Sequence, residues 1–145
     1  ALIRRFHEAK EGGLETVTCW GTGSPLREFL HVDDLGKACV FALENWSALS
    51  SDASKDDQGN PLAFMNVGTG VDLTIKDLAE QIAAVVGFEG TIEWDTSKPD
   101  GTPKKQLDLS QMQGLGWSAK IQLSQGLPAA YSDLLKEEAA QTLRV

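Results

Sequence analysis

The sequence predicts an α/β fold, in which short strands alternate with amphipathic helices. Short β-branched segments bounded by glycine occur along the chain, as at Thr16–Trp20. Between them lie longer segments with apolar residues at helical spacing, and the clearest of these runs from Thr74 to Gly87. Strands that alternate with helices are typical of a layered α/β domain.

In the first half of the chain, glycine and capping residues set the expected boundaries. Gly12 and Gly13 end the first helix, and Asp33 is the expected N-cap of the second. A serine-rich and aspartate-rich stretch that follows this helix is expected to be a mobile loop. The expected elements are a helix over 1–10, a strand over 16–20, a turn over 21–25, a strand over 29–32, a helix over 33–46 and the mobile loop over 47–61.

In the second half of the chain, strands again alternate with helices. Thr74 is the expected cap of an amphipathic helix that ends at Gly87, and serine opens each of the two later helices. Asn66 is expected to satisfy the backbone of a neighbouring loop. The expected elements are strands over 63–67, 91–94 and 106–109, helices over 74–87, 110–115 and 124–138, a loop over 95–104 and a frayed tail over 137–145.

Composition excludes several classes of function. The 145 residues carry a formal charge of -8, which disfavours binding to nucleic acid or to an anionic membrane. No apolar run approaches the roughly 20 residues of a membrane helix, and no signal peptide is visible. The two cysteines lie in dissimilar contexts without metal-ligand spacing, so we expect reduced thiols, no zinc site and a cytoplasmic protein.

Four motifs together resemble one enzyme family. The motifs resemble those of the nucleotide-sugar epimerases, dehydratases and reductases of the extended short-chain dehydrogenase superfamily. Within this superfamily, their sequences are most similar to those of the fucose synthases. The resemblance reaches from the first residue to about Ala130. The motifs are ALIRRFHEA at 1–9, CWGTGSPLREFLHVDD at 19–34, NVGTGVD at 66–72 and DTSKPDGTPKK at 95–105.

Two motifs that the superfamily needs for chemistry are absent from the sequence. A Rossmann-like NAD(P) domain binds pyrophosphate through G-x-x-G-x-x-G, and the chain has only G-x-G at 21–23 and 68–70. The superfamily also uses Tyr-x-x-x-Lys, whereas Tyr131 and Lys136 are five residues apart and lie on different sides of a helix. We therefore expect the C-terminal part of a longer enzyme, with the catalytic residues upstream of Ala1.

The resemblance implies a substrate-binding lobe over residues 1–136, with strands that would complete a missing Rossmann sheet. The intact enzyme would convert GDP-4-dehydro-6-deoxy-D-mannose to GDP-L-fucose by 3,5-epimerisation and NADPH-dependent reduction. NADP would bind the missing N-terminal half, the intact enzyme would be a homodimer, and this piece alone would bind the GDP-sugar without turnover. His7, His31, Cys19 and Cys39 match no catalytic position.

Two alternatives remain open. The chain could be the substrate lobe of another nucleotide-sugar epimerase or dehydratase, or a freestanding nucleotide-sugar binding module. Preference for one nucleotide base would separate the first alternative from a fucose synthase. A coding sequence that continues upstream into the missing motifs would eliminate the second.

Three residues near the turn are the expected ligands of a nucleotide diphosphate and its base. A guanidinium pairs bidentately with phosphate, and the resemblance assigns the counterpart of Arg27 to the diphosphate. The resemblance also favours Arg5 over the adjacent Arg4 as a substrate contact. Trp20 ends a strand before the turn, where its indole could stack on guanine or sugar.

The loop over 95–105 supplies further candidates. Its prolines and glycine suit closure over an anionic ligand, and the resemblance places the counterpart of Lys105 near substrate. Lys98 shares the loop, and Asp100 could accept from a sugar or base hydroxyl or simply stabilise a turn. Some relatives carry a nucleotide-contacting arginine where this chain has Thr91.

Overall fold

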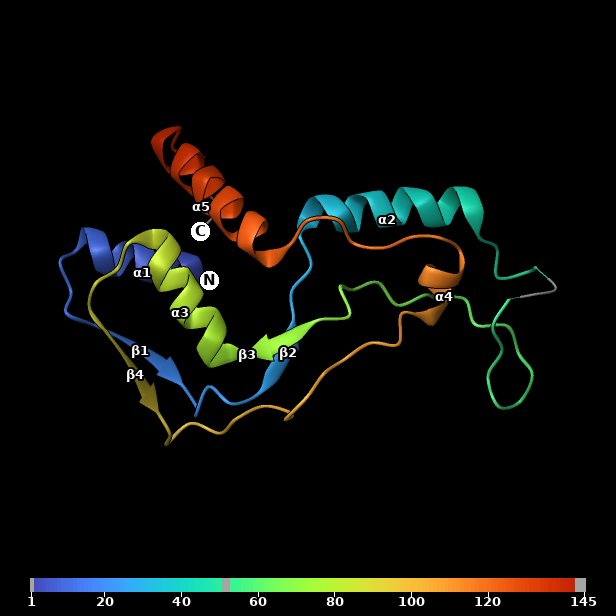
Figure 1. Cartoon of the computed structure of the whole chain (residues 1–145), viewed down its shortest axis with the longest axis horizontal. Coiled ribbons are helices and arrows are strands. Elements are labelled where there is room, and N and C mark those ends of the chain that lie inside the picture. Colours follow the sequence, from blue (N-terminus) through green and yellow to red (C-terminus); the bar gives the residue numbers. More distant parts are fainter. Residues whose placement is uncertain (1, 51–52, 143–145) are drawn as a thin grey trace. The chain divides into compact units, whose positions relative to one another are not determined.

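A computed structural model describes residues 2–50 and 53–142, which form alternating helices and strands (Figure 1). The α/β fold class is therefore confirmed. Within this described part, the chain divides into two compact units, one of residues 2–27, 73–105 and 123–142, the other of residues 28–50, 53–72 and 106–122. The elements are α1 (Leu2–Glu11), β1 (Thr16–Trp20), β2 (Leu26–Glu28), α2 (Val32–Asn45), β3 (Asp72–Thr74), α3 (Ile75–Val86), β4 (Thr91–Asp95), α4 (Ser110–Gly114) and α5 (Leu123–Ala139).

The first unit is built on the parallel pairing of β1 with β4. The register runs from Thr16 opposite Thr91 to Trp20 opposite Asp95. Side chains alternate along a strand, so Val17 and Cys19 share one face, where both are buried. The helices α1 and α3 pack against each other in this unit (Figure 1). The buried apolar side chains of this unit are Phe6, Ala9, Val17, Cys19, Leu78, Ala79, Ile82, Ala83, Val86, Phe88 and Leu127.

Helix α3 has the boundaries that its sequence predicts. Thr74 and Asp77 form a capping box, in which the Thr74 hydroxyl accepts from the Asp77 amide at 2.9 Å. The helix ends at Gly87, whose φ of 74° is in the left-handed region that favours glycine. Phe88 then folds back, and its ring meets that of Phe6 edge to face with centroids 5.5 Å apart.

A buried histidine joins α1 to α5 in the same unit. The Nε2 atom of His7 lies 2.8 Å from the Glu138 carboxylate, and its Nδ1 atom lies 3.1 Å from the Tyr131 hydroxyl. A neutral imidazole satisfies both contacts if Nε2 donates to Glu138 and Nδ1 accepts from Tyr131. His7 therefore links α1 to α5 through Tyr131 and Glu138.

The second unit contains a buried carboxylate. Asp34, in the first turn of α2, is only 1% exposed, and its Oδ2 atom accepts from the backbone N–H groups of Lys120 and Ile121, both at 2.7 Å. The Ile121 hydrogen bond, helped by the one from Lys120, lowers the pKa of Asp34 although burial opposes this shift. Asp34 thus fixes the start of α2 to the chain segment before α5.

The expected N-cap of α2 was wrong by two residues. The cap is His31, whose Nδ1 atom accepts from the Asp33 N–H at 3.2 Å. Asp33 lies inside the first turn, where its negative charge favours the helix N-terminus. The strand expected over 29–32 is also wrong. The strand of this region is Leu26–Glu28, which ends before His31 caps the helix.

Two other expected strands are not formed. Residues 63–67 and 106–109 belong to no strand and form no ladder hydrogen bonds in the described part of the chain. A strand needs a partner backbone at ladder spacing, and here the contact comes from a side chain instead. Asn66 donates through Nδ2 to the Asp108 carbonyl at 3.2 Å, which confirms its expected backbone-satisfying role.

The expected mobility of the loop over 47–61 and the expected fraying of the tail over 137–145 stay predictions. In the loop over 47–61, Asp56 accepts from the backbone N–H groups of Gln58 and Asn60 and so forms a local turn. Residues 51 and 52 of this loop, and 143–145 of the expected frayed tail, lie outside the described residues, as does Ala1. In the part of the chain that the structure describes, no helix is long and apolar enough to span a bilayer.

We predict that Asp34→Ala lowers the free energy of unfolding by about 2–4 kcal/mol, since two buried N–H groups lose a charged acceptor. Urea denaturation followed by circular dichroism measures this change. Asp34→Asn keeps an acceptor oxygen and should lose less. Because the folded pKa lies below the ordinary 3.8, the contribution is complete above that pH and is lost as the pH falls through the folded pKa. Equal stability of wild type and the alanine variant at neutral pH would contradict this role.

Candidate functional site

The candidate site begins with the turn that follows β1. Gly21 and Gly23 adopt φ values of 80° and 75°, which other residues rarely adopt. A Cβ atom on Gly23 would also lie 2.6 Å from the Trp94 ring, so only glycine lets the turn pass over this indole. The start of α3 holds the turn, because Lys76 N–H donates to the Gly23 carbonyl at 2.9 Å.

The loop after β4 is fastened to this turn by Asp100. Its carboxylate accepts from the Thr22 backbone N–H at 2.9 Å and from the Thr22 hydroxyl at 2.6 Å. The side-chain bond, followed by the backbone bond, lowers the pKa of Asp100. Farther along the loop, Leu26 N–H donates to the Pro103 carbonyl at 2.8 Å. The loop over 95–105 therefore lies against the turn and β2 through several hydrogen bonds.

Arg27 sits where the loop and β2 meet. Its Nη1 atom donates to the Leu26 carbonyl at 2.6 Å and to the Thr102 carbonyl at 2.8 Å. In the described part of the chain both bonds leave from Nη1, so the Nε and Nη2 donors remain for a ligand. Two carbonyls thus fix the direction of the guanidinium before any ligand arrives.

A small pocket lies in front of Arg27. Its volume is about 140 Å³, and its wall includes one glycine of the turn after β1, one glycine of the loop after β4 and one exposed indole. Trp20 is 68% exposed, and the Lys98 ammonium lies 5.9 Å from its ring centroid, within the range of a cation–π contact. The lining residues are Trp20, Gly23, Pro25, Arg27, Ile75, Pro99, Asp100 and Gly101.

The structure brings together four of the six predicted ligands. Trp20, Arg27 and Asp100 line the pocket, and Lys98 stands over the indole of Trp20. Lys105 closes the loop, where its N–H donates to the Leu26 carbonyl at 3.4 Å, but it does not line the pocket.

Arg5 lies apart from this group, although it belongs to the same unit. It is exposed on α1 and donates through Nη1 to the Thr18 carbonyl of β1 at 3.1 Å. Burial raises the pKa of the Cys19 thiol, and the Arg5 guanidinium opposes part of this rise. Arg4, the less favoured of the pair, forms an exposed ion pair with Glu8 at 2.7 Å.

Thr22 is the residue that sequence reasoning missed. It supplies both partners of Asp100, which lies 78 positions later in the chain. No local pattern marks such a contact, because it depends on the pairing of β1 with β4. Both Asp100 oxygens are engaged by Thr22, which supports the turn-stabilising interpretation of Asp100, and its role as a ligand acceptor stays a prediction.

No group of three or more His, Cys, Asp or Glu side chains could hold a metal ion among the described residues. Glu28 in β2 accepts from the Gly70 N–H and, at 3.3 Å, from the Thr69 hydroxyl. It therefore fixes the second G-x-G turn rather than leaving it open to an anion.

We predict that Asp100→Ala releases the loop from the turn. Amide hydrogen exchange at Thr22 and over residues 96–104 should accelerate by about tenfold or more, because the Thr22 N–H loses its acceptor. Asp57→Ala, which removes an exposed carboxylate of the other unit, should leave these rates unchanged. Unchanged exchange in the Asp100 variant would show that the remaining backbone bonds suffice to hold the loop.

Comparison with known proteins places these features in a family. Residues 1–55 match the model of the NAD dependent epimerase/dehydratase family. GDP-L-fucose synthase 1 of Arabidopsis thaliana is 52% identical over 94% of this chain and 38% of its own length. GDP-L-fucose synthase of Escherichia coli K12 is 45% identical over 95% of this chain and 42% of its own length.

A solved structure agrees with these matches. A GDP-mannoheptose C4 reductase from Campylobacter jejuni with NADP bound superposes with a TM-score of 0.71 at 32% identity, over 90% of this chain and 42% of that one. The chain thus spans about two fifths of the length of the curated relatives above. The resemblance predicted from the motifs is confirmed. The chain belongs to the NAD-dependent epimerase/dehydratase family and corresponds to the C-terminal part of relatives named GDP-L-fucose synthase.

Proposed function

We propose that this chain forms the nucleotide-sugar-binding part of an NADP-dependent epimerase/reductase. The intact enzyme converts GDP-4-dehydro-6-deoxy-D-mannose to GDP-L-fucose, and it is a cytoplasmic homodimer. The observation that carries the proposal is the fixed guanidinium of Arg27 beside the exposed indole of Trp20, within one small pocket. The names of the relatives support the GDP-sugar.

The geometry suits a diphosphate. Two carbonyls hold Nη1 of Arg27, so the guanidinium can donate to phosphate oxygens through its other nitrogens without first losing side-chain freedom. Lys98 adds a second positive charge over Trp20. On a protein with a formal charge of -8, this local excess of cations favours an anion at this place.

The pocket accommodates only part of a nucleotide sugar. Its volume of about 140 Å³ is below the roughly 300–1,000 Å³ of sites that enclose a whole small molecule. The diphosphate would occupy the pocket, with Trp20 free to stack on a ring at its mouth. The remainder of the ligand would then contact parts of the intact enzyme that precede this chain.

The glycine turns of this chain do not fit the pyrophosphate of NADP. A pyrophosphate needs open backbone at the glycines, but the Asp100 carboxylate stands over Gly21 and the Trp94 ring over Gly23. At the second turn, Glu28 stands against Gly68 and would repel phosphate. The proposal therefore places NADP and the chemical step on the missing part, and this chain binds and orients substrate.

We predict that the chain binds GDP, and that Arg27→Ala weakens this binding about 10- to 100-fold because one charge-assisted contact is lost. Calorimetric titration of GDP, UDP and dTDP measures affinity and base preference. Arg4→Ala is the matched control, since Arg4 is engaged with Glu8 outside the pocket and its loss should leave the affinity unchanged.

Three outcomes would count against the proposal. Preference for UDP or dTDP would indicate the lobe of another nucleotide-sugar epimerase. An equal loss in the Arg4 and Arg27 variants would show a general effect of charge. Absence of any nucleotide binding would show that this chain does not form a diphosphate site by itself.

A further inference from the structure

Thr22 links the turn after β1 to the loop after β4 through its side chain and its backbone. Its hydroxyl donates to one oxygen of the Asp100 carboxylate at 2.6 Å, and its N–H donates to the other oxygen at 2.9 Å. The same hydroxyl accepts from the Ser24 N–H at 3.2 Å and lies 2.7 Å from the Ser24 hydroxyl. An acceptor on one side and a donor on the other fix the orientation of the Thr22 hydroxyl toward Asp100.

The two residues that follow Asp100 lie against the guanidinium of Arg27. The Thr102 carbonyl accepts from its Nη1 atom at 2.8 Å. A Cβ atom built on Gly101 would lie 3.0 Å from its Nη2 atom, and the φ of Gly101 is not in the left-handed region. Glycine at this position therefore provides space for the guanidinium rather than an unusual backbone conformation. Thr22 holds residue 100, residue 102 orients the arginine, and a single residue separates the two contacts.

Segment 100–102 is held at both of its ends. Beyond its C-terminal end, the Leu26 N–H donates to the Pro103 carbonyl at 2.8 Å, and the Lys105 N–H donates to the Leu26 carbonyl at 3.4 Å. At its N-terminal end, the hydrogen bonds that the structure describes for the Asp100 carboxylate all come from Thr22. The backbone bonds of Leu26 therefore fix one end of the segment, and Thr22 fixes the other.

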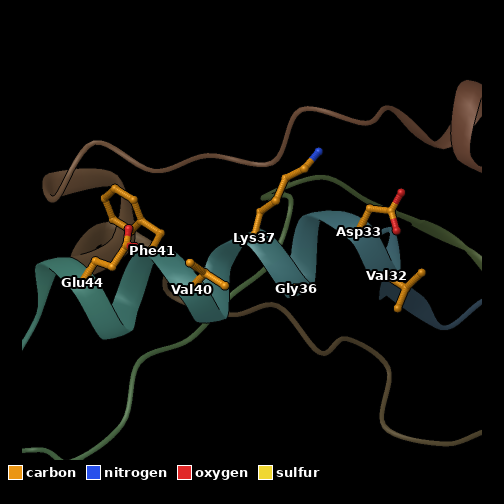
Figure 2. Close-up of a pocket in the computed structure, with 7 residues that line it drawn as sticks. All are labelled: Val32, Asp33, Gly36, Lys37, Val40, Phe41 and Glu44. Carbon is orange, nitrogen blue, oxygen red and sulfur yellow. The ribbon is translucent and has the colours of Figure 1, made fainter.

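The surroundings of Arg27 control its direction rather than its charge. Its two described partners are neutral carbonyl oxygens. The hollow of about 520 Å³ along α2 in the other unit differs, because its cation, Lys37, shares the lining with the carboxylates of Asp33 and Glu44 (Figure 2). Opposite charges one or two turns apart on a helix offset one another. A cation held by carbonyls keeps its charge for an anion, and its use to a ligand depends on where its remaining N–H groups point.

We propose that Thr22 is a positioning residue for the diphosphate-binding arginine, because through Asp100 it fixes the carbonyl that orients the Arg27 guanidinium. This inference rests on the proposed function, since it takes the ligand of Arg27 to be the diphosphate of a GDP-sugar. Thr22 itself does not line the pocket. Without its hydroxyl, Asp100 keeps one bond to the turn, and segment 100–102 is held firmly only at its far end. Arg27 then regains side-chain freedom that ligand binding must remove.

Removal of one hydroxyl tests the proposal through GDP affinity. Thr22→Val keeps the shape of the side chain and the backbone bond to Asp100 but removes the hydroxyl. Calorimetric titration should show GDP binding weakened about three- to tenfold, which corresponds to one net hydrogen bond. Thr22→Ser keeps the hydroxyl and should bind GDP as the wild type does. Thr142→Val is the matched control, because it removes an exposed hydroxyl outside the pocket and should leave the affinity unchanged.

A double-mutant cycle shows whether Thr22 acts through Arg27. In the Arg27→Ala background, Thr22→Val should weaken GDP binding by less than about twofold, because the side chain that it positions is gone. A three- to tenfold loss that persists in this background would show that Thr22 and Asp100 act on the ligand directly, which would contradict the positioning role.

A second measurement needs no ligand. Nuclear magnetic resonance of the guanidinium nitrogens gives the rate at which Nη1 and Nη2 of Arg27 exchange by rotation about the Nε–Cζ bond, and the signals are assigned by their loss in Arg27→Ala. The two carbonyl bonds to Nη1 oppose this rotation. We expect the exchange to be at least about threefold faster in Thr22→Val and unchanged in Thr22→Ser.

The proposal requires both changes in Thr22→Val. Unchanged rotation in a variant that circular dichroism shows to be folded would mean that the backbone bonds of Leu26 suffice to orient Arg27. An equal loss in Thr22→Ser would assign the effect to side-chain volume rather than to the hydroxyl. If Thr22→Val does not fold, Thr22→Ala removes the same hydroxyl, and the same criteria apply.

The two measurements separate this inference from the proposed function. Faster rotation in Thr22→Val without GDP binding by the wild type contradicts only the proposed function. GDP binding that depends on Arg27 but is the same in Thr22→Val contradicts only the role of Thr22.

Discussion

The parallel pairing of β1 with β4 is the interaction on which the candidate site depends. The register sets Trp20 opposite Asp95, so the turn after β1 and the loop after β4 leave the same edge of the sheet. Every later contact of the site follows from this placement. Thr22 reaches Asp100, Leu26 reaches Pro103, and the carbonyl of Thr102 reaches the guanidinium of Arg27. Loss of the ladder would separate all of them.

The loop over 95–105 and the turn after β1 stabilise each other at a modest cost in side-chain entropy, because their hydrogen bonds lie mainly between backbone groups and short side chains. Asp100 is exposed, so its contact with Thr22 contributes little to overall stability but determines where the loop lies. The cation Arg27 is instead held by carbonyl oxygens, which fix its direction without cancelling its charge. Such an arrangement retains an unneutralised guanidinium on an acidic chain, which is what an anionic ligand requires.

Within the second unit, the two sides of α2 differ in their exposure to solvent. Asp34 is buried and is satisfied by two backbone donors, so it fixes α2 within its unit. The other side of α2 exposes Val32, Val40 and Leu43, which gain nothing from solvent. The pocket of the first unit is small and open, and this side of α2 is apolar and exposed.

The sequence by itself determined the family, the α/β class and the elements whose signals are local. Thr74 and Gly87 bound α3 because capping and left-handed glycine are properties of neighbouring residues. Trp20 and Arg27 could be named as candidate ligands because they flank one turn within a recognisable motif, and both line the pocket. Only the tertiary structure decided that Thr22 holds Asp100 and that residues 63–67 and 106–109 lack strand partners. These features depend on which distant segments meet, and periodicity along one segment carries no information about its neighbour in space.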